Sequence, residues 1–231
     1  MISSIPSLKK KQMPNPVVPV LYEDQECIVF DKPAGLLTIP TDKNEDDRNL
    51  VDVVRDQKGE GLHPAHRLDR DTSGVILFAR SKDVQQKLMD SFKGRLVHKQ
   101  YVAFVHGRVK EREGKILIPI KDFYQKQFNK NLPPQSAVTH YRVREYHKDF
   151  TVVDVVPITG RTNQIRIHFS KIGHPLVGED KYAFRKDFKL RFRRTALHAA
   201  RLEWPQPMTG KSCVAQAPLP DDMKKFLETN P

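Results

Sequence analysis

The side chains best suited to chemistry are concentrated in HRLDRDTSG, a segment that begins at His66. If its first part is extended, side chains alternate, so Arg67 and Asp69 share one face. His66, Leu68 and Arg70 then share the opposite face. A carboxylate beside a guanidinium can stay ionised in a pocket and act as a nucleophile. A surface ion pair followed by a DTSG turn would use the same residues, so this segment alone does not distinguish a catalytic site from a surface ion pair.

The nine histidines and two cysteines give no convincing metal site. His63 and His66 stand three residues apart, but no third ligand accompanies them at a suitable spacing. Cys27 and Cys213 are far apart and have no partner cysteines, which argues against a disulfide framework. We therefore expect no metal ion, and a reducing cytoplasm as the location.

The charge of the chain points to an anionic partner. Its 231 residues contain 40 Lys and Arg against 28 Asp and Glu, which gives a formal charge of +12 and a pI near 9.7. RNA or DNA suits such a surface, because bound phosphates release condensed counterions. An anionic membrane surface also suits it, although no segment is long and apolar enough to span a membrane.

The length fits one hydrophobic core, so we expect a disordered basic arm over residues 1–16 and a single domain over residues 17–231. Strand and helix patterns alternate briefly and then give way to successive strands, which favours an α+β fold. The expected helices are Leu50–Gln57, Lys82–Phe92 with Ser81 as N-cap, Thr162–Gly173 with Thr162 as N-cap and Gly173 as C-terminal stop, and Asp221–Thr229. The expected strands are two within residues 17–33, then 75–80, 101–109, 115–120, 137–147, 150–156 and 195–204.

Several segments together resemble one known family. HRLDRDTSG resembles the catalytic signature of the RluA-type pseudouridine synthases, and other segments match that family in the same order. An ordered set of long motifs is far more specific than any single short pattern. These segments are KPAGLLTIP (32–40), KQYVAFVHG (99–107), PITGRTNQIRIHFSKIGHPLVGEDKY (157–182) and LHAARLEWPQPMTG (197–210).

The resemblance implies a mixed, mainly antiparallel sheet in two subdomains, with flanking helices around a central RNA-binding cleft. It implies isomerisation of uridine to pseudouridine in structured ribosomal or transfer RNA, without any cofactor. A monomer is expected, with no separate N-terminal RNA-binding domain, because only a short tail precedes the first motif.

The resemblance also assigns roles to particular residues. Asp69 corresponds to the family's nucleophilic aspartate, Tyr101 to its base-stacking tyrosine, and Arg166 to the basic residue that pairs with the aspartate. We expect Arg166 to hold down the pKa of Asp69, because desolvation alone would raise it. On the predicted helix, Arg166 would share a face with Ser170, opposite the apolar residues.

Contacts with RNA are expected from further polar residues. Basic and aromatic side chains alternate over residues 121–130 and 181–194, a mixture typical of RNA surfaces. Asn163 departs from the resemblance, because the family usually has His there and Asn does not titrate near neutral pH. The predicted RNA-binding residues are Arg67, Arg70, Arg161, Asn163, Lys181 and Arg185.

Two other functions fit the same sequence. A noncatalytic RNA-binding or ribosome-assembly protein could keep the cleft and its charge without using Asp69. A base-excising glycosylase could use Asp69 with water, although no second carboxylate is clearly paired with it.

Overall fold

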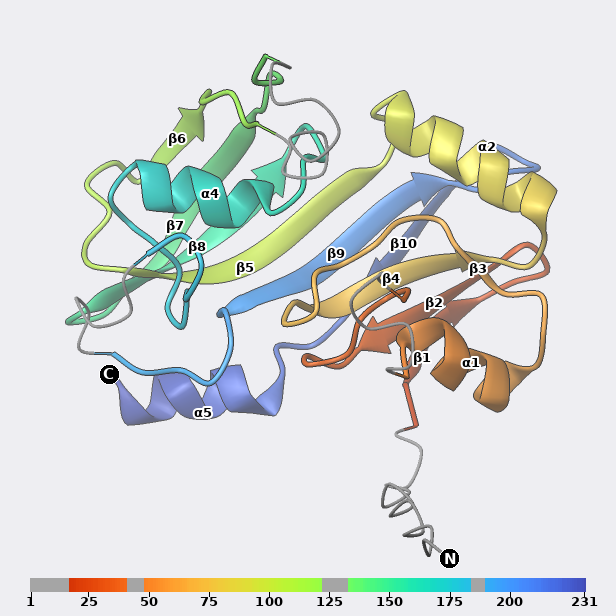
Figure 1. Cartoon of the computed structure of the whole chain (residues 1–231), viewed down its shortest axis with the longest axis horizontal. Helices are drawn as coiled ribbons and strands as arrows, with labels where there is room; N and C mark the ends of the chain where they lie inside the picture. The colour runs from red at the N-terminus through yellow and green to blue at the C-terminus, as the bar shows by residue number, and fades with distance from the viewer. Residues whose placement is uncertain (1–16, 41–47, 122–132, 184–189) are drawn as a thin grey trace, which may run out of the picture.

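The computed structural model describes residues 17–40, 48–121, 133–183 and 190–231. Its centre is a mixed ten-stranded sheet with the order β1-β2-β4-β9-β5-β8-β7-β6, while β3 pairs with β4 and β10 with β9 (Figure 1). Within the described ranges, every ladder is antiparallel except that between β4 and β9. The strands are β1 (Val20–Glu23), β2 (Cys27–Lys32), β3 (His63–Pro64), β4 (Ser73–Ala79), β5 (His98–His106), β6 (Glu113–Ile116), β7 (Thr139–Tyr146), β8 (Phe150–Pro157), β9 (Leu197–Pro205) and β10 (Ser212–Gln216).

The sheet has two halves, and helices cover both faces of each half (Figure 1). Around β2 and β4, α1 packs on one face and α2 on the other, because alternate strand residues point to opposite sides. Around β5 and β8, α4 and α5 cover the two faces in the same way. The expected α+β fold in two subdomains is therefore confirmed. The helices are α1 (Leu50–Lys58), α2 (Lys82–Lys93), α4 (Gln164–Lys171) and α5 (Asp221–Thr229).

Caps and first-turn charges explain why three of the four predicted helices begin where the sequence indicated. Ser81 accepts a hydrogen bond from the Val84 N–H, so α2 has the expected N-cap. Asn49 caps α1 and forms a capping box with Asp52. α5 starts after Pro220 with two aspartates in its first turn, where the helix dipole favours negative charge.

The predicted N-cap of α4 is wrong by one residue. The N-cap is Asn163 rather than Thr162, and its backbone is left-handed, with φ of 54°. No side chain caps this helix; instead, buried Gln164 ties it to β7 through hydrogen bonds to Val138 and Thr139. Gly173 ends the helix as expected, with φ of 84°.

Strand β6 is also displaced from its prediction. The apolar run over residues 115–120 indicated a strand there, but regular pairing covers only Glu113–Ile116, opposite β7. Beyond it, Ile120 forms a single bridge to Gln135. An apolar pattern marks burial, and the register of the partner strand decides where pairing stops.

The parallel pairing of β4 with β9 depends on Gly74. Its φ is 108°, and a Cβ added there would lie 2.2 Å from the Ala199 carbonyl oxygen. Only glycine therefore lets the two strands approach. The turn that follows Asp69 leads directly into the contact between β4 and β9. This contact therefore fixes the C-terminal side of the turn.

None of the helices that the structure describes is long and apolar enough to cross a membrane.

Candidate active site

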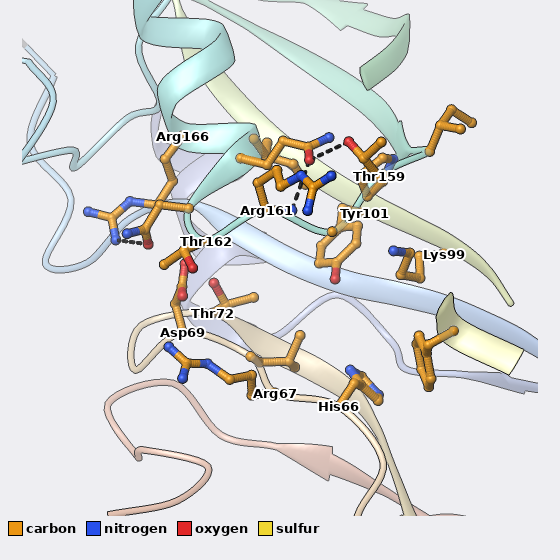
Figure 2. Close-up of a pocket in the computed structure, with 18 of the residues that line it drawn as sticks. His66, Arg67, Asp69, Thr72, Lys99, Tyr101, Thr159, Arg161, Thr162 and Arg166 are labelled. Carbon is orange, nitrogen blue, oxygen red and sulfur yellow. Dashed lines mark hydrogen bonds between the residues drawn. The ribbon is translucent and has the colours of Figure 1, made fainter. Parts of the chain in front are cut away.

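A cleft of about 640 Å³ lies between the two halves of the molecule. Its walls come from the 65–72 loop, the end of α2, β5, the loop after β8 and the start of α4 (Figure 2). Asp69, Tyr101 and Arg166, which come from three separate segments, all line it. The structure thus brings the three predicted catalytic residues into one cavity.

The loop that carries Asp69 is held extended from its buried side. Leu68 packs in the core, and both its N–H and its C=O bond to the Thr38 hydroxyl, at 3.2 and 3.0 Å. Arg67 and Asp69 on either side of Leu68 line the cleft, as alternation predicted. His66 and Leu68 were predicted on the opposite face but also line the cleft, in the case of His66 because the chain bends at that residue. Its Nε2 accepts the Leu77 N–H, and burial lowers its pKa to about 3.

Two buried cations hold the turn that follows Asp69. The Asp69 carbonyl accepts a hydrogen bond from the Thr72 N–H, which closes the turn. Lys32 Nζ donates a hydrogen bond to the backbone carbonyl of Arg70 at 3.0 Å. A guanidinium nitrogen of Arg194 donates to the backbone carbonyl of Asp71, also at 3.0 Å. Carbonyls bonded to fixed cations cannot rotate freely, so the backbone beside Asp69 is rigid.

Lys32 is fully buried. Its ammonium group also donates to the carbonyls of Pro33 and Leu36, within the KPAGLL turn. Burial lowers its pKa to about 7, against the opposing effect of Asp71 and Asp69. The first matching motif therefore lies directly under the loop that carries Asp69.

Arg166 does not form the predicted ion pair with Asp69. Its guanidinium binds both carboxylate oxygens of Glu179, at 2.7 and 2.8 Å, in a partly buried pair. Its charge still lowers the pKa of Asp69, together with Arg67, Lys32 and Lys181. Burial outweighs these cations, so the pKa of Asp69 is raised above its ordinary value and the expected depression is wrong.

Asn163 fits its position because of its backbone. Asn tolerates the left-handed conformation better than most residues, and φ is 54° here. Its side-chain oxygen accepts from Arg166 at 3.2 Å, and its amide nitrogen donates to the Tyr182 hydroxyl at 2.9 Å. Asn163 therefore orients Arg166, a task that requires no titration.

Tyr101 lines the middle of the cleft and packs against the cores of both halves. Burial raises its pKa, and the charge of Asp69 raises it further. The phenol is therefore neutral and can donate a hydrogen bond, while its ring offers a flat surface to a base.

The other predicted RNA-binding residues divide into three groups. Arg67, Arg161 and Asn163 line the cleft, whereas Arg70 and Lys181 lie outside its walls. Arg185 lies outside the described residues, as does nearly all of the segment 121–130. Arg194 belongs to a segment predicted to contact RNA, but it is buried and bonded to Asp222, so for this residue the prediction is wrong.

Sequence reasoning assigned no role to Lys32, Lys99 and Glu179, and the wrong role to Arg194, although all four residues shape this site. Lys32 ends a strand whose first four residues are apolar, which could have signalled a buried cation. Lys99 precedes Tyr101 by two positions on a strand, which could have placed both side chains in one cleft. Glu179 and Arg194 carried no such signal, since their partners are distant in sequence.

The fold is that of pseudouridylate synthase domains. The solved structure of human RNA pseudouridylate synthase domain containing 1 aligns with a TM-score of 0.73 and 22% identity, covering 96% of this chain and 100% of that one. Residues 26–171 match the sequence model of the family described as RNA pseudouridylate synthase.

Curated relatives agree with this match. The ribosomal large subunit pseudouridine synthase D of Xanthomonas campestris is 36% identical, over 90% of this chain and 68% of the relative. The dual-specificity RNA pseudouridine synthase RluA of Vibrio cholerae is also 36% identical, over 84% of this chain and 79% of the relative. This chain therefore belongs to the RNA pseudouridylate synthase family, whose members are isomerases.

Proposed function

We propose that this chain converts uridine to pseudouridine in structured RNA, with Asp69 as the nucleophile. One observation carries the assignment: among the described residues that line the cleft, Asp69 is the only carboxylate. It shares the cleft with the aromatic ring of Tyr101 and with a set of cations. These cations are Arg67, Lys93, Arg95, Lys99, Arg161 and Arg166.

The reaction needs one covalent catalyst and no redox partner. The Asp69 carboxylate bonds either to the anomeric carbon of ribose, displacing uracil, or to carbon 6 of the base. The glycosidic bond to nitrogen is broken and the uracil turns. Carbon 5 then bonds to the sugar, the bond to Asp69 breaks, the proton of carbon 5 leaves to solvent, and nitrogen 1 takes up a proton.

The cleft supplies what either route requires. A uridine must leave its stack to reach Asp69, and Tyr101 offers a face on which the extruded base can stack. Arg166 and Arg67 favour the ionised form of Asp69 against the cost of burial. Negative charge that develops on uracil would be stabilised by the same cations.

A base-excising hydrolase is less well supported. Hydrolysis of a glycosidic bond usually needs one carboxylic acid and a second carboxylate to activate water. The described lining of the cleft offers only Asp69. A noncatalytic RNA-binding protein would in turn gain nothing from a desolvated carboxylate, which repels phosphates.

We further propose ribosomal RNA or transfer RNA as substrate and the cytoplasm as location, with the chain acting as a monomer. The name of the Xanthomonas relative, a ribosomal large subunit pseudouridine synthase, supports the first of these. The net charge of +12 supports binding to a long polyanion.

The test is release of tritium from RNA labelled at carbon 5 of uracil. Asp69→Asn keeps the shape of the side chain and removes its charge, so we expect release to fall by at least about a thousandfold. Asp149→Asn, an equal change at an exposed residue outside the cleft, is the control and should match the wild type. Release that survives in Asp69→Asn would refute the role of Asp69. Loss of RNA mass in the wild type would instead show base excision.

A further inference from the structure

One end of the cleft contains groups that the proposed reaction leaves unused. Beyond Tyr101, the wall continues to the C-terminal end of α2 and the turn into β5. We call this part the α2 arm. It is formed by Met89, Phe92, Lys93, Arg95 and Lys99.

Lys99 is a cation without a counter-ion. Its pKa is lowered, and burial is the sole cause, so no carboxylate offsets the desolvation of its ammonium group. Its side chain forms no hydrogen bond or ion pair with any residue in the described ranges. Its charge also contributes to the low pKa of His66, beside which it lies (Figure 2).

Arg95 has an unfavourable backbone. Its φ is 60°, the left-handed conformation in which a Cβ is strained, and it occupies the position after a helix where glycine is usual. Its N–H bonds to the Phe92 carbonyl, and the Leu96 N–H bonds to that of Ser91, so the turn itself is regular. The exposed Arg95 side chain bonds to none of the described residues.

The desolvated charge of Lys99 and the left-handed backbone of Arg95 thus occur together, and no carboxylate within the described chain offsets the first. A ligand with negative charge would offset the desolvation of Lys99 and could pair with the exposed guanidinium of Arg95, and no carboxylate occupies the α2 arm. Phe92 and Met89 add apolar surface between the cations, the combination that single-stranded nucleic acid uses for backbone and bases. Strain that persists without an internal reason is typical of functional positions.

We propose that the α2 arm binds the phosphates on one side of the extruded uridine, with Lys99 holding the nearest phosphate and Arg95 and Lys93 the following ones. The proposal rests on the proposed function for the identity of the RNA. In Figure 2, Tyr101 lies between Asp69 and Lys99, so a base stacked on the ring would have its backbone within reach of the ammonium group.

The first test measures affinity for a fluorescein-labelled RNA hairpin with a uridine loop. All proteins carry Asp69→Asn, so that turnover does not affect binding. Lys99→Gln should weaken binding by roughly tenfold, the usual loss for a charge-assisted hydrogen bond. It should also reduce the salt dependence of binding by about one charge. Lys148→Gln, at an exposed site away from the cleft, should change neither. Equal effects of the two variants would overturn the proposal.

The second test asks whether the ligand group is a phosphate. Single phosphates of the loop are replaced by uncharged methylphosphonates. At one position the replacement should weaken RNA binding by the protein that carries Asp69→Asn alone. At the same position it should cause no further loss of binding in the protein that also carries Lys99→Gln. If the losses add fully at every position, Lys99 contacts no phosphate and the proposal fails.

The third test separates a binding role from a structural one. Lys99→Met and Arg95→Gly remove a desolvated charge and a strained backbone, so both should raise the melting temperature of the free protein while weakening RNA binding. Lower melting temperatures would show that these residues serve the fold. Because binding is measured without turnover, failure of the catalytic role of Asp69 would leave these results interpretable.

Discussion

Asp69 differs from an ordinary surface aspartate in the balance of forces on its charge. Burial raises its pKa, while Arg166, Arg67, Lys32 and Lys181 lower it. The net shift is upward, so each of these cations keeps more of the carboxylate ionised at a given pH. Activity that depends on the ionised form must therefore fall on the acid side at a pH set partly by these neighbours.

Arg67→Gln should move the acid limb of the pH–rate profile to higher pH. The substitution removes a cation that lowers the pKa of Asp69, so the carboxyl group becomes protonated at a higher pH than in the wild type. The profile is measured under single-turnover conditions with saturating enzyme, which removes the effect of weaker RNA binding. Arg142→Gln, at an exposed position outside the cleft, should leave the limb in place. An unmoved limb, or one at lower pH, in Arg67→Gln would show that this cation does not act on Asp69.

The sequence motifs identified the main residues of the site but missed the partners that hold them. Asp69, Tyr101 and Arg166 were found because each lies in a long motif. The partner of Arg166 was missed, because Glu179 reaches it only after the chain folds back from the end of α4. The buried roles of Lys32 and Arg194 were missed for a similar reason, since each also bonds to a carbonyl of the distant turn after Asp69, Lys32 to that of Arg70 and Arg194 to that of Asp71.

At the scale of elements, the close contact between β4 and β9 is the feature that joins the site to the sheet. The two strands form the one parallel ladder described, and it pairs Ser73 and Gly74 with His198 and Ala199. Ser73 and His198 also bond through their side chains at 3.0 Å, in the buried interior. Displacement of these strands would therefore move the turn that carries Asp69.

Gly74→Ala should destabilise the protein by about 3 kcal/mol or more, because the new Cβ would overlap the Ala199 carbonyl and strain a left-handed backbone. The matched control is Gly59→Ala, which also has positive φ but nothing within 4 Å of the new Cβ. It should cost only about 1 kcal/mol, the backbone strain alone. Urea unfolding midpoints measure both. Similar losses in the two variants would show that strand approach does not require glycine.

Element prediction succeeded where the signal is local. Ser81 caps α2 as expected, and α1 and α5 begin at the predicted residues, Leu50 and Asp221. It failed at the start of α4, where Asn163 adopts a left-handed backbone that tertiary contacts impose. It failed again at β6, whose end depends on β7.

At the scale of the whole molecule, the two halves of the sheet supply different parts of the cleft. The half with β4 contributes the rigid loop of Asp69, and the half with β5 and α4 contributes Tyr101 and Arg166. Mainly antiparallel strands and five segments in the family order were enough to predict this architecture. The order of the strands and the parallel ladder were not, because they depend on pairing between distant segments.

The central claim is that the charge of Asp69 drives isomerisation of uridine in RNA. The most direct measurement is pseudouridine mapping of cellular RNA from three strains: wild type, gene deletion, and chromosomal Asp69→Asn with equal protein level. We predict that the positions lost in the deletion are lost in Asp69→Asn as well, since the variant keeps the fold and the RNA surface. Pseudouridine that persists at those positions in Asp69→Asn would contradict the account.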